Sequence, residues 1–392
     1  MSKVSGFYFS GISSGLKKSG KKDLALIFSK VPCNTSAVFT KNLVKAAPVI
    51  LGQQRIKKGI CQAIIINSGN ANACTGKKGY QDSVFTANAI AKKLNIDEEL
   101  VIPSSTGVIG QPLATEKIEK AIPDLVSSLG ETNLEDTAAA ILTTDKFIKT
   151  STRSLKIGSK TGTISAVGKG AGMICPDMAT MLTFIMTDIA IGKSALKKAF
   201  KTSMNNSFNK IIVDGDTSTN DSAFIMSNGL LGNVEINEKS SLYNKFLKSL
   251  TEVCMEIAEL IVKDGEGATK VVKVEVTGAR TEKDAERIAR TIGNSQLSKT
   301  AFYGEDANWG RIIGAAGRAG VKFDPDNIEL FFDGIKVYSK GVQHQPESKF
   351  AHVFKKPNFK VTIKLKEGNA GSYIITSDLT HEYVSINASY RS

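Results

Sequence analysis

The segment that constrains this chain most runs from residue 169 to residue 188 and reads KGAGMICPDMATMLTFIMTD. Residues 181–186 form an apolar run that has the length of a buried strand and is far too short to span a membrane. Thr180 therefore stands at the start of a predicted strand, directly behind the small residue Ala179. A threonine hydroxyl in that position can attack the carbonyl group of the preceding residue, and water can hydrolyse the resulting ester.

Cleavage between Ala179 and Thr180 would expose the α-amine of Thr180, whose pKa near ~8 suits a general base for the threonine's own hydroxyl. The chain would then consist of two fragments, residues 1–179 and 180–392. We expect the fragments to stay associated, because the apolar run must pack against strands of the first fragment. A threonine that begins a strand commonly has only a structural role, so this local pattern leaves both interpretations open.

The composition fits an ordinary globular protein without a zinc site or a multi-histidine metal site. With 392 residues, the chain is long enough for two lobes or for one large α/β unit. The five cysteines are scattered without a CxxC pair and the three histidines all lie near the C-terminus, which argues against a zinc site or a multi-histidine site. No apolar stretch resembles a signal peptide or a membrane span, and reduced thiols are typical of the cytoplasm, where we expect the protein to be.

The charge raises an alternative from another class, a basic nucleic-acid-binding protein. The formal net charge is +13, but the excess consists mostly of lysines spread in pairs, and arginine is sparse. No helix-turn-helix, RNA-recognition or zinc-finger pattern appears, so we expect solvated lysine faces and no nucleic-acid partner. Salt-sensitive retention on DNA would favour the alternative.

Hydrophobic periodicity predicts helices and strands in mixed order along the chain. The predicted helices are one that contains Val84, Ala87, Ala91 and Leu94, and those at residues 116–129, 135–142, 193–208, 243–263 and 284–292. The predicted strands are residues 62–67, 163–167, 181–186, 271–276, 328–332, 359–365, 372–375 and 383–386. Thr132 and Glu135 have the spacing of a capping box, and residues 104–107 (SSTG) are typical of a turn. This order predicts an α/β or α+β layered sandwich in which helices cover the strands.

Four further residues have side chains or N–H groups suited to catalysis or binding. Thr106 and Gly107 follow a short predicted strand, and a hydroxyl beside a glycine N–H is a suitable pair of donors for an oxyanion. Lys169 precedes the expected scissile bond closely enough to meet a substrate carboxylate. Glu266 lies between two glycines, where it can project into a site and pair with an ammonium group, although each of these patterns also occurs in ordinary turns.

The sequence GMICPDMATML closely resembles the cleavage-site signature of the glutamate N-acetyltransferase family, also called the ornithine acetyltransferase family. Three further segments extend the resemblance over nearly the whole chain, namely NSGNANACTG, VDGDTSTND and YGEDANWGRI, which begin at residues 67, 213 and 303. Each could be an Asn/Asp/Gly-rich loop by itself, but the four in this order make a chance similarity very improbable.

The resemblance implies an α-β-β-α-type sandwich like that of the self-cleaving aminopeptidases and ornithine acetyltransferases, built from both cleavage products. It implies that Thr180 is the nucleophile and that Thr106 and Gly107 form the oxyanion hole. The remaining family substrate contacts fall on Thr143, Lys169, Glu266, Asn387 and Ser392. The family commonly ends in threonine, so the final serine retains the hydroxyl and loses the methyl group.

The implied function is a step of arginine biosynthesis, the transfer of acetyl from N²-acetylornithine to glutamate in a ping-pong cycle. The resemblance implies that no metal or bound organic cofactor is needed. Some members also use acetyl-CoA as a co-substrate, and no residue here distinguishes the two types. The implied assembly is a heterotetramer of two copies of each fragment. The alternative is a self-cleaving aminopeptidase or amidase of the same architecture, in which water or another amine accepts the acyl group.

Overall fold

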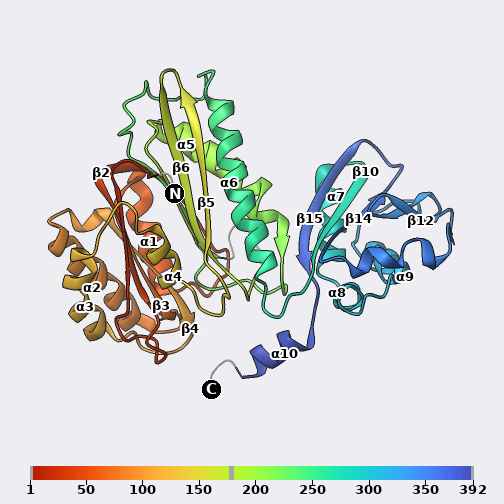
Figure 1. Cartoon of the computed structure of the whole chain (residues 1–392), viewed down its shortest axis with the longest axis horizontal. Coiled ribbons are helices and arrows are strands. Elements are labelled where there is room, and N and C mark those ends of the chain that lie inside the picture. Colours follow the sequence, from red (N-terminus) through yellow and green to blue (C-terminus); the bar gives the residue numbers. More distant parts are fainter. Residues whose placement is uncertain (1–2, 176–180, 390–392) are drawn as a thin grey trace. The chain divides into compact units, whose positions relative to one another are not determined.

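A computed structural model describes residues 3–175 and 181–389 and divides them into two compact units (Figure 1). The first unit contains residues 3–170, 181–209 and 217–261, and the second contains residues 171–175, 210–216 and 262–389. The chain therefore passes repeatedly from one unit to the other. Within the described residues, no helix is both long and apolar enough to cross a membrane.

The first unit is built on an eight-stranded mixed sheet with the order β4-β3-β2-β9-β7-β6-β5, in which β1 also pairs with β2. The pairs β3–β4 and β7–β9 are parallel, whereas the other neighbours are antiparallel. The strands are β1 (Phe7–Ile12), β2 (Leu24–Phe39), β3 (Ile60–Asn70), β4 (Val101–Val108), β5 (Lys149–Ile157), β6 (Lys160–Lys169), β7 (Leu182–Thr187) and β9 (Ser222–Ser227).

Helices cover this sheet, as the sequence predicts. They are α1 (Ala47–Arg55), α2 (Gly76–Leu94), α3 (Thr115–Ser127), α4 (Leu134–Ala140), α5 (Lys193–Asn206) and α6 (Tyr243–Lys263), of which α6 has the predicted bounds. In α3, Ile118, Ile122 and Leu125 recur at helical spacing and are buried in one core with α2, β2 and β3. Burial of each such side chain contributes about 1.5–3 kcal/mol, which outweighs the modest propensity of so short a helix.

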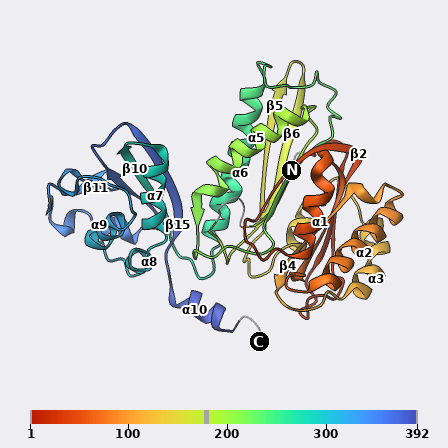
Figure 2. The ribbon, with the colours of Figure 1, turned by 180° about the vertical axis from the view of Figure 1, so that it is seen from behind.

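Strand β7 confirms the predicted strand after the first motif, shifted by one residue, and all six of its residues are buried. It pairs antiparallel with β6 and parallel with β9, while β9 pairs with β2 on its other side. Figure 2 shows β2 and β6 of this sheet from behind. The two strands that follow residue 180 in the sequence, β9 and β7, therefore lie side by side between β2 and β6, which precede it.

The second unit has a seven-stranded mixed sheet with the order β13-β12-β11-β14-β10-β15-β8. The strands are β8 (Ile211–Ile212), β10 (Val271–Ala279), β11 (Glu329–Phe332), β12 (Ile335–Ser339), β13 (Val342–Gln343), β14 (Asn358–Lys364) and β15 (Ala370–Ser377). Helices α7 (Glu282–Gly293) and α9 (Trp309–Gly317) bury apolar side chains against the sheet, and α8 (Gln296–Tyr303) and α10 (His381–Ala388) complete the unit. Short 3₁₀ turns occur at Ile56–Lys58, Glu98–Leu100, Phe208–Lys210, Pro325–Asn327, Glu347–Lys349 and Ala351–Lys355.

The predicted class, a mixed α/β fold with helix-covered strands, is confirmed, but three local predictions are wrong. Residues 104–107 are not a turn, because β4 continues through Ser105 and Thr106, which pair with Asn67 and Ser68 of β3. Hydrogen bonding to the neighbouring strand thus overrides the local preference of Ser and Gly for turns.

The other two errors concern helix beginnings. The expected capping box is absent, because α4 begins at Leu134 and its N-cap is Asn133, whose side-chain amide donates instead to the carbonyl oxygen of Ser128. Residues 383–386 form part of helix α10 and not a strand. The Thr380 hydroxyl accepts a hydrogen bond from the N–H of Tyr383 and so caps this helix, and the β-branched Val384 is left 62% exposed.

Candidate active site

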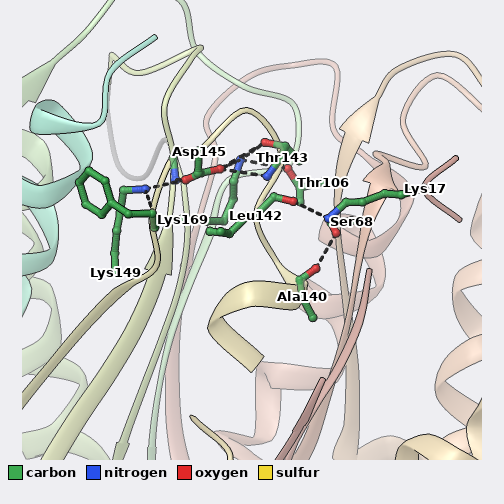
Figure 3. A network of polar contacts seen from close by, with 11 residues as sticks. Lys17, Ser68, Thr106, Ala140, Leu142, Thr143, Asp145, Lys149 and Lys169 are labelled. Carbon is green, nitrogen blue, oxygen red and sulfur yellow. Dashed lines mark hydrogen bonds and ion pairs between the residues drawn. The ribbon is translucent and has the colours of Figure 1, made fainter. Parts of the chain in front are cut away.

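The first unit gathers three of the expected site residues in one polar network (Figure 3). Thr106 lies on β4, Lys169 is the last residue of β6, and Thr143 lies between α4 and β5. The Lys169 ammonium group donates to the hydroxyl of Thr143 at 2.8 Å and lies 3.5 Å from that of Thr106. Only 8% of Lys169 is exposed, so the network holds a nearly buried cation beside two hydroxyl groups.

The structure explains why residue 107 is a glycine. Its φ is +132°, and a Cβ at this position would lie 2.4 Å from the carbonyl carbon of Gly69 and 2.5 Å from the backbone nitrogen of Asn70. No L-residue side chain fits between β4 and β3 at this point. The glycine is therefore required by the close approach of two strands, whether or not its N–H serves an oxyanion.

Asp145 is a member of this network that the sequence analysis missed. Its carboxylate is fully buried and accepts hydrogen bonds from the N–H groups of Thr143 at 3.0 Å and Gly170 at 2.7 Å. It forms an ion pair with Lys149 at 2.8 Å and lies 3.7 Å from the ammonium nitrogen of Lys169. Burial opposes ionisation, but the two ammonium groups hold the pKa of Asp145 well below its usual range. The ionised carboxylate thereby fixes the position of Lys169.

Lys17 is a second residue that the sequence did not reveal. Its ammonium group donates to the carbonyl oxygen of Leu142 at 2.8 Å and to that of Lys22 at 2.9 Å. Burial lowers the pKa of Lys17 to about 8, with Asp23 opposing the change and Lys169 adding to it. In the sequence, this residue belongs to one of the lysine pairs that were assigned to solvated faces.

Two of the Asn/Asp-rich motifs have a role in positioning β4. The side-chain amide of Asn220 donates to the carbonyl oxygens of Ala71 at 2.6 Å and Ser105 at 2.8 Å. The hydroxyl of Ser105 in turn donates to the side-chain oxygen of Asn67 at 2.5 Å. The neighbouring Asp221 is buried, which raises its pKa well above the usual value, and its Oδ2 has no hydrogen-bond partner among the described residues.

The second unit brings Glu266 and Asn387 together. The side-chain amide of Asn387 in α10 donates to Oε2 of Glu266 at 2.9 Å, and the N–H of Glu266 donates to the carbonyl oxygen of Ala171 at 3.0 Å. Glu266 is only 7% exposed, so it is not the solvated turn residue that its flanking glycines also allowed. A Cβ on Gly172 would lie 2.6–2.7 Å from its carboxylate group.

Asp214 holds the short segment that leads toward residues 176–180. Its two carboxylate oxygens accept hydrogen bonds from the N–H groups of Met173 at 2.7 Å and Ile174 at 2.8 Å. Met173 has a φ of +55°, an uncommon conformation for a non-glycine residue. Burial raises the pKa of Asp214, and the backbone hydrogen bonds oppose that rise.

Four predicted residues (Thr106, Gly107, Thr143 and Lys169) thus lie close together in the first unit, and two (Glu266 and Asn387) are in contact in the second. Ala179, Thr180 and Ser392 lie outside the described residues, so their predicted roles stay predictions. Within residues 3–175 and 181–389, no group of three or more His, Cys, Asp and Glu side chains is placed to hold a metal ion.

The two helix-covered mixed sheets define a mixed α/β protein, and its first unit contains a buried lysine beside two hydroxyl groups, an arrangement typical of an enzyme's polar site. The model of the ArgJ family matches residues 8–392. The chain belongs to the ArgJ family.

Two relatives match the sequence of this chain over nearly the full length of both proteins. The chain is 48% identical to the arginine biosynthesis bifunctional protein ArgJ of Geobacter sulfurreducens, over 99% of both chains. It is 49% identical to the protein of the same name from Syntrophotalea carbinolica, over 100% of both. A solved structure of the arginine biosynthesis bifunctional protein ArgJ of Bacillus halodurans is similar with a TM-score of 0.51 and 38% identity, over 52% of this chain and 97% of that chain. The family expected from the sequence motifs is therefore confirmed.

Proposed function

We propose that this chain carries out two acetyl transfers of arginine biosynthesis, from N²-acetylornithine to glutamate and from acetyl-CoA to glutamate. Support comes from its membership of the ArgJ family and from full-length relatives that are described as bifunctional proteins of arginine biosynthesis. The observation that carries the proposal is the Lys169–Thr143–Thr106 network, which offers a cation and hydroxyl donors on that family's scaffold.

In the proposed cycle, the α-amine of Thr180 takes the proton from the Thr180 hydroxyl as its oxygen attacks the acetyl carbonyl. The Thr106 hydroxyl and the Gly107 N–H donate to the developing oxyanion. Ornithine leaves with the proton, which yields an acetyl ester on Thr180. The amine of glutamate then attacks this ester, and Thr180 is regenerated together with N-acetylglutamate.

The remaining residues bind the two substrates in this proposal. Lys169, with Thr143, receives the α-carboxylate that donor and acceptor share, and Glu266 receives the side-chain ammonium group of the donor. Asn387 supports Glu266 through its hydrogen bond, and Ser392 contributes its hydroxyl. The fragments 1–179 and 180–392 assemble as two copies of each in the cytoplasm, and neither nucleic acid nor membrane takes part.

Self-cleavage is tested by intact-mass measurement of the purified wild-type protein and of the Thr180→Ala variant. We expect two co-purifying fragments for the wild type, cut between Ala179 and Thr180, and one uncut chain for the variant. Cleavage of Thr180→Ala at this bond would rule out Thr180 as the nucleophile.

The activity is tested on the same preparations by following N-acetylglutamate from acetylornithine and from acetyl-CoA. We expect both reactions in the wild type and neither in Thr180→Ala. Release of acetate from acetylornithine at the same rate without glutamate would instead identify an amidase.

A further inference from the structure

The first-unit network carries more positive charge than its own carboxylates balance. The network contains three ammonium groups: those of Lys149 and Lys169 lie beside Asp145, and that of Lys17 contacts the carbonyl oxygen of Leu142 (Figure 3). Asp145 is already paired with Lys149 at 2.8 Å, which leaves it 3.7 Å from Lys169. A buried or half-buried cation without a close counter-ion is costly, so this arrangement favours the binding of an anion.

Asp23 does not neutralise Lys17 by direct contact. Its carboxylate accepts hydrogen bonds from the backbone N–H groups of Ser14 at 2.6 Å and Lys17 at 2.9 Å, and it also accepts from the Ser14 hydroxyl. Among the described residues, no carboxylate lies within ion-pair distance of the Lys17 ammonium group. Asp23 therefore fixes the loop that carries Lys17 and leaves the cation to other partners.

The ammonium groups of Lys17 and Lys169 are held by two consecutive residues. Lys17 donates to the carbonyl oxygen of Leu142, and Lys169 donates to the hydroxyl of Thr143. The aliphatic part of the Lys17 side chain also lies against Gly69, the residue that pairs with Gly107 of β4. The two cations are thus fixed beside the proposed oxyanion donors, and Lys17 has used two of its three N–H groups on described residues.

We propose that Lys17 and Lys169 together form a two-cation site for a dianionic acceptor, in which Lys17 receives the side-chain carboxylate of glutamate. This inference rests on the proposed function, because it assigns the second carboxylate of that acceptor. The corresponding end of acetylornithine bears an ammonium group, which Glu266 receives in the proposed function, so Lys17 makes no contact with the donor's side chain. Lys17 therefore acts on acceptor specificity and leaves the donor half of the cycle unaffected. A phosphate group of acetyl-CoA has the same charge chemistry and is distinguished in the experiment.

The experiment compares the wild type with Lys17→Gln, using Lys18→Gln as the control because Lys18 is the exposed neighbour. With acetylornithine as donor, kcat/KM is measured for glutamate and for glutamine, which has the same shape without the charge. We expect Lys17→Gln to lower kcat/KM for glutamate roughly 10–100-fold, the effect of losing one charge-assisted hydrogen bond, with little change for glutamine. Lys18→Gln should match the wild type.

Two outcomes overturn the inference. An equal loss for glutamate and glutamine would mean that Lys17 only supports the fold of the loop. If Lys17→Gln lowers kcat/KM with acetyl-CoA as the donor, but not with an S-acetyl thioester that lacks phosphates, Lys17 would be assigned to the phosphate. A wild-type enzyme with no transferase activity would overturn the proposed function itself, which is a different result.

A second measurement needs no variant and covers the case in which Lys17→Gln does not fold. The processed wild-type enzyme is treated with an amine-reactive acylating reagent, and modification is mapped by peptide mass spectrometry. Because its pKa is lowered to about 8, Lys17 should react readily. We expect glutamate, but not glutamine, to protect Lys17, while Lys18 reacts equally in all samples. Equal protection by both ligands, or by neither, contradicts the assignment.

Discussion

Gly172 is a glycine because of what lies beside it. The structure assigns it no positive φ, so its backbone conformation does not exclude a side chain. A Cβ would nevertheless lie within 2.6–2.7 Å of the Glu266 carboxylate group, and contacts this short force a shift. The position of Glu266 therefore depends on the absence of a side chain at Gly172.

Gly172→Ala should lower kcat/KM for acetylornithine by about tenfold, since the displaced Glu266 no longer meets the donor's ammonium group well. The loss should disappear in a Glu266→Ala background, where the added methyl group has no carboxylate to displace. Gly314→Ala serves as the control, because nothing lies within 4 Å of a Cβ there. Additive losses in the double variant would show that Gly172 acts independently of Glu266.

Thr106 provides a second test at the level of a single hydroxyl. Thr106→Ala should reduce kcat by roughly 10²–10³-fold with little change in KM, because the lost donor acts on the oxyanion and not on the ground state. Thr106→Ser retains the hydroxyl and should recover most of the rate. A rise in KM at unchanged kcat would assign Thr106 to binding, in line with its position 3.5 Å from the Lys169 ammonium group.

At the scale of secondary structure, helix α10 shows how a short element depends on its cap. The Thr380 hydroxyl accepts from the N–H of Tyr383 at 3.2 Å and donates to the carbonyl oxygen of Gly267 at 2.9 Å. The helix has eight residues, none of them buried, so packing adds little to its stability. Asn387, which contacts Glu266, lies in its last turn.

Thr380→Ala should remove about 1 kcal/mol of capping and let α10 fray. We expect faster amide hydrogen exchange across residues 381–388 and a several-fold higher KM for acetylornithine, with Tm nearly unchanged. Thr380→Ser should behave as the wild type. Unchanged exchange in the alanine variant would show that other contacts hold the helix.

The elements differ in how well the sequence predicted them, and the reason is physical. Helix α6 and strand β7 were predictable because their apolar residues repeat with a regular period and are buried. Strand β4 was cut short and α10 was read as a strand, because pairing with β3 and the Thr380 cap are contacts that no local pattern contains.

The site was predictable only where a motif carried it. Thr106, Thr143 and Lys169 were expected together and are together. Asp145 and Lys17 were missed, because their importance arises from burial and from partners that local sequence does not connect. A lysine pair in the sequence gives no sign of which lysine is half-buried beside another cation.

At the scale of the whole molecule, two pairs of neighbouring strands in the first sheet join the two proposed fragments. Strand β2 pairs with β9, and β6 pairs with β7, so in each pair a strand from residues 1–179 is hydrogen-bonded to a strand from residues 180–392. The side chains of β7 and β9 share one core with β1, β3 and α4. A cut between the fragments would remove one covalent bond and none of these contacts, which supports the expected association.

The link between β6 and β7 has a consequence for the end that cleavage would create. Neighbouring antiparallel strands can be joined by two residues, whereas this link spans residues 170–181, and its segment 171–175 is hydrogen-bonded to Asp214 and Glu266. A carboxylate formed at Ala179 would be only four residues from Cys175 in the sequence, and four residues span at most roughly 14 Å. Its local concentration would then be set by this covalent connection and not by the concentration in solution. Dialysis or dilution removes a bound substrate anion, but it would not remove a carboxylate that is covalently part of the first fragment.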